Sequence, residues 1–248
     1  MGQYQDVFRR VEKKYLLPQD AYQELSRRLK GAIKEDEYGK TSICNIYYDT
    51  PDSRLIRVSL EKPVYKEKLR LRSYGIPRED STVFVELKKK YKGVVYKRRA
   101  DMTLVQARAF LNQRRLLQPQ ASQIQREISW VLGYYPNLGP AMFVSYERTA
   151  AYGIEDPGLR ITFDEHILYR TQQLDLRAGI WGRELLKPGM RLMEIKIGGS
   201  MPLWLAGILD DLHIYPVSFS KYGGAYCQLL QTGNGTTSHT GGNVSYAS

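Results

Sequence analysis

Residues 65–75, with the sequence YKEKLRLRSYG, constrain the fold more than any other part of the chain. In an extended strand, successive side chains point to opposite faces. The basic residues of this stretch then share one face, while Leu69 and Leu71 lie on the other. The basic residues are Lys66, Lys68, Arg70 and Arg72. Adjacent cations repel one another and cannot face a dry core, so this face meets either water or a strongly anionic ligand.

The same alternation of charged and apolar residues recurs along the chain. Segments 10–14, 83–88, 159–164 and 192–197 each place charges on one face, and Met142, Val144 and Tyr146 lead to Arg148 on a common face. Three strands carry a Glu two positions before a Lys: Glu12–Lys14, Glu86–Lys88 and Glu194–Lys196. A sheet with one wet face would explain any single strand. The whole set favours a closed antiparallel β-barrel with a charged interior.

The predicted fold class is therefore α+β, with amphipathic helices packed outside the barrel. Helices are predicted over residues 18–30, 103–117, 121–132 and 202–212. Segments 66–74 and 82–90 form a hairpin, and Lys92-Gly93 makes a tight turn into the next strand. Residues 1–231 form one domain, and the Gly/Ser/Thr/Asn-rich residues 232–248 are predicted to be a disordered tail.

The net charge of +11 indicates a polyanionic partner, although a generally basic surface is the alternative. Cys44 and Cys227 have no metal-ligand spacing and indicate a reducing compartment. No signal peptide and no run of about 18 apolar residues is visible, so we expect no transmembrane segment and a cytoplasmic location.

Other phosphate-binding and metal-binding patterns are absent from the sequence. It contains neither of the two common Gly-rich phosphate loops. The basic runs 88–90 and 97–99 resemble a nucleic-acid patch, but strand alternation places Lys88 and Lys89 on opposite faces, so no nucleic acid is expected. The three histidines are isolated in sequence and are interpreted as core or surface residues: His166, His213 and His239.

The ordered set of motifs resembles a known family. RVEKK (10–14) resembles the E-x-E-x-K signature of the CYTH superfamily, the triphosphate tunnel metalloenzymes, with Arg10 in place of the first Glu. The remaining motifs resemble the catalytic domain of the VTC polyphosphate polymerases, in matching order over residues 9–230. They are KLRLRSYG (68–75), VFVELK (83–88), YERTA (146–150), LRITFD (159–164), MEIK (193–196) and SFSKY (218–222).

This resemblance implies a tunnel that binds ATP and a divalent metal, Mn²⁺ or Mg²⁺, and transfers the γ-phosphate to inorganic polyphosphate with release of ADP. It implies catalytic, phosphate-binding roles for Lys14, Arg70, Arg72, Lys88, Arg148, Arg160 and Lys221. Lys97 and Lys196 are further phosphate-binding candidates. Glu194 would be catalytic as the metal ligand, and Glu12 and Glu86 would assist directly or through water. Family members can work beside membrane proteins, but nothing in the sequence identifies such a partner.

Two alternatives stay open. One is a metal-dependent triphosphatase of the same fold, and the other is a non-catalytic polyphosphate-binding module. Arg10 and the excess of cations favour the polymerase over hydrolysis, which usually needs more carboxylates around its metals. Glu194 favours catalysis, because a pure polyanion binder gains nothing from a carboxylate in its tunnel. Ser218 stands where the family pattern can have a second Lys, which could alter handling of the chain.

Overall fold

The computed structural model describes residues 11–113 and 121–233. Ten strands form one antiparallel sheet in the order β1-β10-β8-β7-β3-β4-β5-β6, with β2 added beside β7 and β9 beside β8. The strands are β1 (Val11–Leu17), β2 (Ile33–Glu35), β3 (Thr41–Asp49), β4 (Tyr65–Tyr74), β5 (Thr82–Tyr91), β6 (Val94–Thr103), β7 (Gly139–Gly153), β8 (Arg160–Arg170), β9 (Arg183–Glu184) and β10 (Arg191–Ile197). The helices are α1 (Gln19–Leu29), α2 (Arg54–Leu60), α3 (Leu104–Gln113), α4 (Gln123–Tyr134), α5 (Leu203–Asp211) and α6 (Lys221–Gly233), and a 3-10 turn, η1, covers Leu176–Ala178.

The predicted hairpin and most predicted helices are confirmed. β4 and β5 pair as expected, and the turn into β6 has positive φ angles of 46° at Lys92 and 85° at Gly93, as tight hairpin turns require. Helix α2 was not predicted, because its sequence follows directly on strong turn residues. Asp49, at the end of β3, accepts hydrogen bonds from the backbone N–H groups of Leu55 (2.8 Å) and Ile56 (3.0 Å), so it orders the start of this helix.

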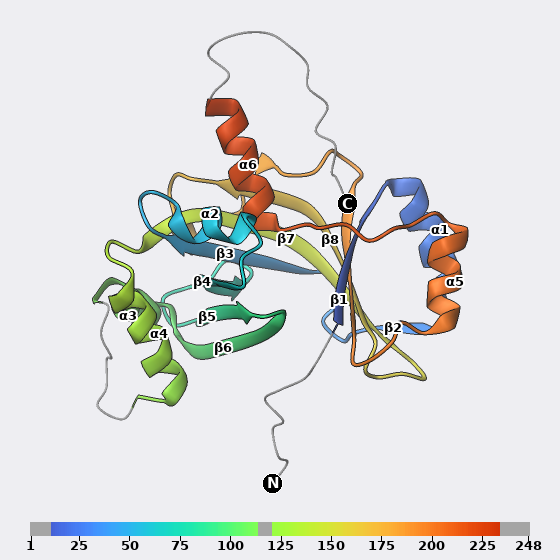
Figure 1. Cartoon of the computed structure of the whole chain (residues 1–248), viewed down its shortest axis with the longest axis horizontal. Helices are drawn as coiled ribbons and strands as arrows, with labels where there is room; N and C mark the ends of the chain where they lie inside the picture. The colour runs from blue at the N-terminus through green and yellow to red at the C-terminus, as the bar shows by residue number, and fades with distance from the viewer. Residues whose placement is uncertain (1–10, 114–120, 234–248) are drawn as a thin grey trace.

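The sheet curls but does not close. β1 pairs only with β10 and β6 only with β5, so the described residues contain no hydrogen-bonded ladder between the two edge strands. The prediction of a closed barrel is therefore not confirmed. Figure 1 shows the curved sheet with α3 and α4 at one side and α1 and α5 at the other.

The convex face of the sheet is apolar, as predicted. Leu69, Leu71 and Val85 pack with Phe110 of α3 and Ile128 of α4 in one core. A second core lies under α1 and α5: its strand residues include Tyr15, Ile161 and Ile195, and its helix residues include Leu25 and Leu205. Burying each such side chain contributes about 1.5–3 kcal/mol, so these two cores fix which face of every strand points outward.

Two helices depart from the prediction that all helices lie outside. Ile56 of α2 and Tyr222 of α6 belong to a third apolar core with Tyr47, Met142 and Val144, whose side chains point to the concave face. The two helices contact each other and cover one end of that face (Figure 1). The charged lining is therefore confined to the rest of the concave face.

Helix α6 extends two residues beyond the predicted domain boundary, and the division into a domain and a tail stays a prediction. Thr232 and Gly233, assigned to the tail from sequence, still belong to this helix, and residues 234–248 lie outside the described residues. Arg10 and His239 lie outside them as well. No helix within the described ranges is long and apolar enough to cross a bilayer.

Candidate active site

The first group of charges on the concave face surrounds Glu86 of β5. Glu86 lies opposite Arg70 of β4 on one side and opposite Arg99 of β6 on the other. Its carboxylate is 2.7 Å from Arg70 Nη2, 3.7 Å from Arg72 Nε, 3.1 Å from Lys97 Nζ and 3.1 Å from Arg99 Nε. We call these five residues the Glu86 cluster. Four cations sharing one carboxylate leave the cluster strongly positive.

Neighbouring side chains fix the two predicted arginines. Arg70 Nη1 donates to Tyr47 Oη at 3.2 Å. Arg72 donates to Asn45 Oδ1 at 2.9 Å and to Tyr146 Oη at 3.3 Å. Because the guanidinium planes are held, they are suited to bidentate binding of phosphate oxygens. The supporting tyrosines and Asn45 were not predicted, since no sequence pattern distinguishes them from ordinary strand residues.

The structure shows which of residues 97–99 face the site. Lys97 and Arg99 point to the concave face, whereas Arg98 points outward to Glu127 of α4, with Nε 2.9 Å from Oε2. Arg99 is a cluster residue that the sequence analysis missed, although alternation from Lys97 would have found it. Burial alone would raise the pKa of Glu86, but Arg70, Arg72 and Lys97 outweigh it and lower the pKa to about 2.

The second group of charges surrounds Glu194 of β10. Glu194 is 3.9 Å from Lys14 Nζ, 3.6 Å from Arg148 Nη2, 3.6 Å from Lys196 Nζ and 3.3 Å from Lys221 Nζ. Two more carboxylates join the same cations. The Glu194 cluster consists of Glu12, Lys14, Arg148, Asp164, Glu194, Lys196 and Lys221.

Asp164 is the acidic residue of this cluster that the sequence analysis did not assign. Its fully buried carboxylate accepts both Arg148 Nε (2.6 Å) and Arg148 Nη2 (2.7 Å), and it lies 2.5 Å from Lys221 Nζ. It shares one strand face with Arg160 and Thr162, so alternation placed it correctly, but nothing in the sequence showed its partners. Asp164 thereby ties β7, β8 and α6 together at the site.

Ionisation in the Glu194 cluster follows from these contacts. Burial opposes the charge on Glu194, yet Lys221, Lys14 and Arg148 hold its pKa far below the usual range. Burial likewise opposes the charge on Lys221, but Asp164 and Glu194 raise its pKa. Glu194 and Lys221 are therefore both charged at neutral pH without a bound ligand.

Lys68 lies in different surroundings from the two clusters. Its Nζ donates to Ser220 Oγ, just before α6, at 3.0 Å, and within the described residues it has no carboxylate partner. Burial, followed by the nearby charges of Lys14, Lys66 and Lys88, lowers its pKa to about 7. Lys68 is half-buried, so water screens its charge less than it screens those of the exposed Lys88 and Lys90.

The remaining predicted residues lie around these clusters. Arg160 is at the rim, with 57% of its side chain exposed and its Nη2 3.6 Å from Asp36. Lys88 is exposed, and its charge, with that of Lys14, lowers the pKa of Glu12 on β1 against the opposing effect of burial. β1 and β5 therefore act on each other across the concave face. Ser218 is exposed.

The oxygen atoms near Glu194 fit a hard divalent cation. Thr162 lies opposite Glu194 in the β8–β10 pairing, and its buried Oγ1 has no hydrogen-bond partner within the described residues. Carboxylate, hydroxyl and phosphate oxygens are ligands that Mg²⁺ and Mn²⁺ prefer. Glu194 and Glu12 could supply the carboxylates. Within the described ranges, Glu86 shares no ion-pair partner with Glu12 or Glu194, so it belongs to a different cluster. A metal-binding role for Glu86 stays a prediction, and this placement gives it no support.

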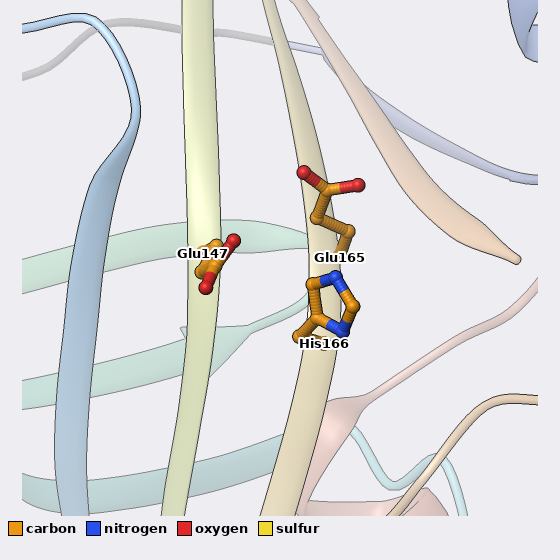
Figure 2. A group of neighbouring side chains, drawn as sticks. All are labelled: Glu147, Glu165 and His166. Atoms are coloured by element: carbon orange, nitrogen blue, oxygen red, sulfur yellow. The ribbon is translucent and has the colours of Figure 1, made fainter. Parts of the chain in front are cut away.

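Another group that could hold a metal ion lies away from both clusters. Glu147 of β7 and Glu165 and His166 of β8 have ligand atoms within 4.8 Å of one another (Figure 2). His166 is an exposed residue, in agreement with its interpretation from sequence, although it lies beside two carboxylates in space. Lys40 forms ion pairs with both carboxylates, and Arg191 Nη2 is 2.8 Å from Glu165 Oε2, so these acids already have cationic partners.

Comparison with known families decides the assignment of the chain. The model of the VTC domain matches residues 9–230. The chain belongs to the VTC domain family. The resemblance inferred from the motifs is thereby confirmed.

Solved structures similar to this VTC domain include two candidate adenylate cyclases. The protein from Bacillus halodurans has a TM-score of 0.53 and 16% identity, over 87% of this chain and 94% of its own. The protein from Vibrio parahaemolyticus has a TM-score of 0.49 and 13% identity, over 92% of this chain and 99% of its own. The first likeness shows a shared fold. No curated protein matches the sequence of this VTC domain.

Proposed function

We propose that this VTC domain is an ATP-dependent polyphosphate polymerase, which transfers the γ-phosphate of ATP to a growing polyphosphate chain and releases ADP. The observation that carries the proposal is Glu194 surrounded by four cations on the concave face of a sheet that also bears the Glu86 cluster. A metal-compatible carboxylate thus lies on the same basic face as fixed arginines. That combination matches the requirements of phosphoryl transfer, which depends on positioning and positive charge.

The reaction requires no nucleophile from the protein. A terminal phosphate oxygen of the acceptor chain is already an anion, and it forms the new bond to the γ-phosphorus while the bond from that phosphorus to the β-phosphate bridging oxygen breaks. The electron pair leaves with ADP. Arg70 and Arg72 would orient the phosphates by bidentate contacts, and Lys14, Lys196 and Lys221 would oppose the charge that develops on the oxygens.

The metal requirement follows from the charge of the site. Glu194 already balances several cations, so a divalent ion gains most when phosphate oxygens bind it at the same time. We therefore propose that Mn²⁺ or Mg²⁺ arrives with ATP and is held by Glu194 and Glu12. When bound, it would neutralise phosphate charge and help to orient the reacting groups. A cytoplasmic location, where ATP is supplied, is part of this proposal.

Asp164 supports a second candidate function. With Glu12 and Glu194 it makes three carboxylates in one cluster, and a triphosphatase uses such groups to hold metals and water. Against hydrolysis, Asp164 is fully engaged by Arg148 and Lys221. The polymerase is therefore the better supported of the two.

Phosphorus NMR of the purified protein with ATP and Mn²⁺ separates the possibilities. Growth of an internal-phosphate signal together with ADP would establish the polymerase. Free phosphate without chain growth would establish the triphosphatase instead. Unchanged ATP together with saturable binding of polyphosphate would leave a binding module and overturn both enzymatic proposals.

A further inference from the structure

Four lysines on the concave face form no ion pair within the described residues. They are Lys66 and Lys68 on β4 and Lys88 and Lys90 on β5, and we call them the lysine quartet. Pairing of the two strands places Lys66 opposite Lys90 and Lys68 opposite Lys88. Like charges directly opposite one another destabilise an antiparallel pair. Here two such pairs follow in succession, without a carboxylate to separate them.

Solvation alone does not account for this arrangement. Lys88 and Lys90 are exposed, so water relieves their repulsion, but Lys68 is half-buried and its amino group donates to Ser220 Oγ beside α6. Lys66 Nζ in turn donates to the carbonyl oxygen of Ser59 in α2 at 3.0 Å. Two of the four amino groups are thus held in position by neutral acceptors. An anion bound against the quartet would supply the missing negative charge.

The quartet continues the row of arginines along one strand face. Arg72, Arg70, Lys68 and Lys66 succeed one another on the concave side of β4. An anionic chain that is bound at the arginines and runs along β4 therefore passes over the quartet. Lys14 of β1 donates to the carbonyl oxygen of Phe219 at 2.9 Å, next to Ser220, which accepts from Lys68, so β1 borders the same path.

The chemistry changes along this row. In the Glu86 cluster, guanidinium groups are fixed by a carboxylate and by tyrosine hydroxyls, which suits phosphates that must be held for reaction. The quartet offers ammonium point charges on flexible stems, with no acid to fix them. Such contacts hold a phosphate chain without a fixed register, so the chain can advance after each transfer.

We propose that the lysine quartet is the subsite for the part of a polyphosphate chain that extends beyond the reacting phosphates. The ligand class rests on the proposed function. The new assignment concerns Lys66, Lys68 and Lys90, to which the family motifs give no role. It predicts that affinity depends on the quartet increasingly as the chain lengthens.

Titration calorimetry without turnover tests this subsite. In EDTA, the wild type and the double variant Lys66→Gln/Lys90→Gln are titrated with inorganic triphosphate and with polyphosphate of about one hundred units. Glutamine keeps a polar donor for Ser59 and removes like-charge repulsion, so the fold should be retained. The matched control is Lys89→Gln/Lys13→Gln, which removes two charges but none from the concave face. Lys89 points outward, with Nζ 5.8 Å from the centroid of the Trp130 ring, and Lys13 is an exposed residue of β1 that lies opposite Ile195 of the second core.

We expect affinity for the long chain to fall at least about tenfold in the quartet variant, with triphosphate affinity changed less than about twofold and the control near wild type. An equal loss for both ligands, or no loss beyond the control, would overturn the subsite. The proposed function is judged separately by the NMR assay. Chain growth with an unaffected quartet variant would refute only the subsite, whereas quartet-dependent binding without chain growth would refute only the polymerase.

Discussion

Lys221 Nζ lies 2.5 Å from Asp164 Oδ2, and this contact anchors the first residue of α6 to the middle of β8. Both side chains are almost inaccessible to water, with exposures of 8% and 0%. The same carboxylate holds Arg148, so one buried acid compensates two buried cations. The helix that covers the end of the concave face is therefore held in place through charged residues of the candidate active site.

Replacing Asp164 with Asn should lower the free energy of unfolding by about 3–5 kcal/mol, because Arg148 and Lys221 lose their buried partner. Urea denaturation measures this change. Asp80→Asn, whose side chain is 75% exposed, is the control and should change stability by less than about 0.5 kcal/mol. Inorganic triphosphate should stabilise the Asp164 variant more than the wild type, since phosphate replaces the lost charge. An unchanged unfolding free energy would contradict the role given to Asp164.

The Glu194→Gln variant should lose turnover while it still binds triphosphate in EDTA at least as tightly as the wild type. The change removes a metal ligand, but it also removes a negative charge from among the phosphate-binding cations. Phosphorus NMR measures turnover, and calorimetry measures binding. Glu165→Gln alters the other metal-compatible group (Figure 2) and should leave turnover intact. Loss of turnover in the Glu165 variant alone would indicate that the metal binds to the group of Glu147, Glu165 and His166 instead.

The Arg70→Ala/Arg72→Ala variant should weaken triphosphate binding by at least about 100-fold, since it removes two fixed bidentate groups. It should also be less stable, because Arg72 is buried and donates to Asn45 and Tyr146. Calorimetry and thermal melting check the two effects. The Arg70→Lys variant retains the charge but lacks the paired N–H donors of the guanidinium group, so it should show an intermediate affinity for triphosphate. Wild-type affinity in the double variant would show that the two arginines of the Glu86 cluster do not bind triphosphate.

Lys68 should make the binding of long-chain polyphosphate depend on pH. Its pKa of about 7 lies below the ordinary value, so above pH 7 the free protein holds Lys68 increasingly neutral, and binding must take up a proton. Affinity should therefore fall from pH 7.5 to 9, by up to about tenfold per unit. Calorimetry in buffers of different ionisation enthalpy detects the proton uptake. In Lys68→Met this component should vanish; an identical pH profile would exclude Lys68 from the site.

The lowered pKa of Lys68 also makes the stability of the protein depend on pH. Between pH 7 and the ordinary lysine pKa, the unfolded chain binds more protons than the folded one, so this residue's contribution to folding improves as pH rises. Its penalty is largest below pH 7, where the buried amine is charged. The Lys68→Met variant should accordingly melt several degrees higher than the wild type at pH 6, with a smaller difference at pH 9. A lower melting temperature at pH 6 would contradict this.

Strand alternation predicted the faces of the sheet well, because a two-residue period is a local property. It placed Arg70, Glu86 and Lys88 on charged faces and Leu69, Val85 and Leu87 on apolar ones, and the structure agrees. Closure of the sheet depends instead on whether β1 and β6 come within hydrogen-bonding distance, which no local pattern encodes. The partnership of Asp164 with Lys221 likewise joins residues 57 positions apart, and only the folded chain shows it.

The unpaired edges of the sheet bear on how a polymer reaches the site. A closed ring of strands can be filled only by threading a free end through it. Because no ladder joins β1 to β6 in the part of the chain described, hydrogen bonds between strands do not restrict a long polyanion to entry by threading. The middle of a chain, and even a cyclic phosphate without ends, could then lie along the groove sideways, so capture would not have to wait for a terminus to arrive.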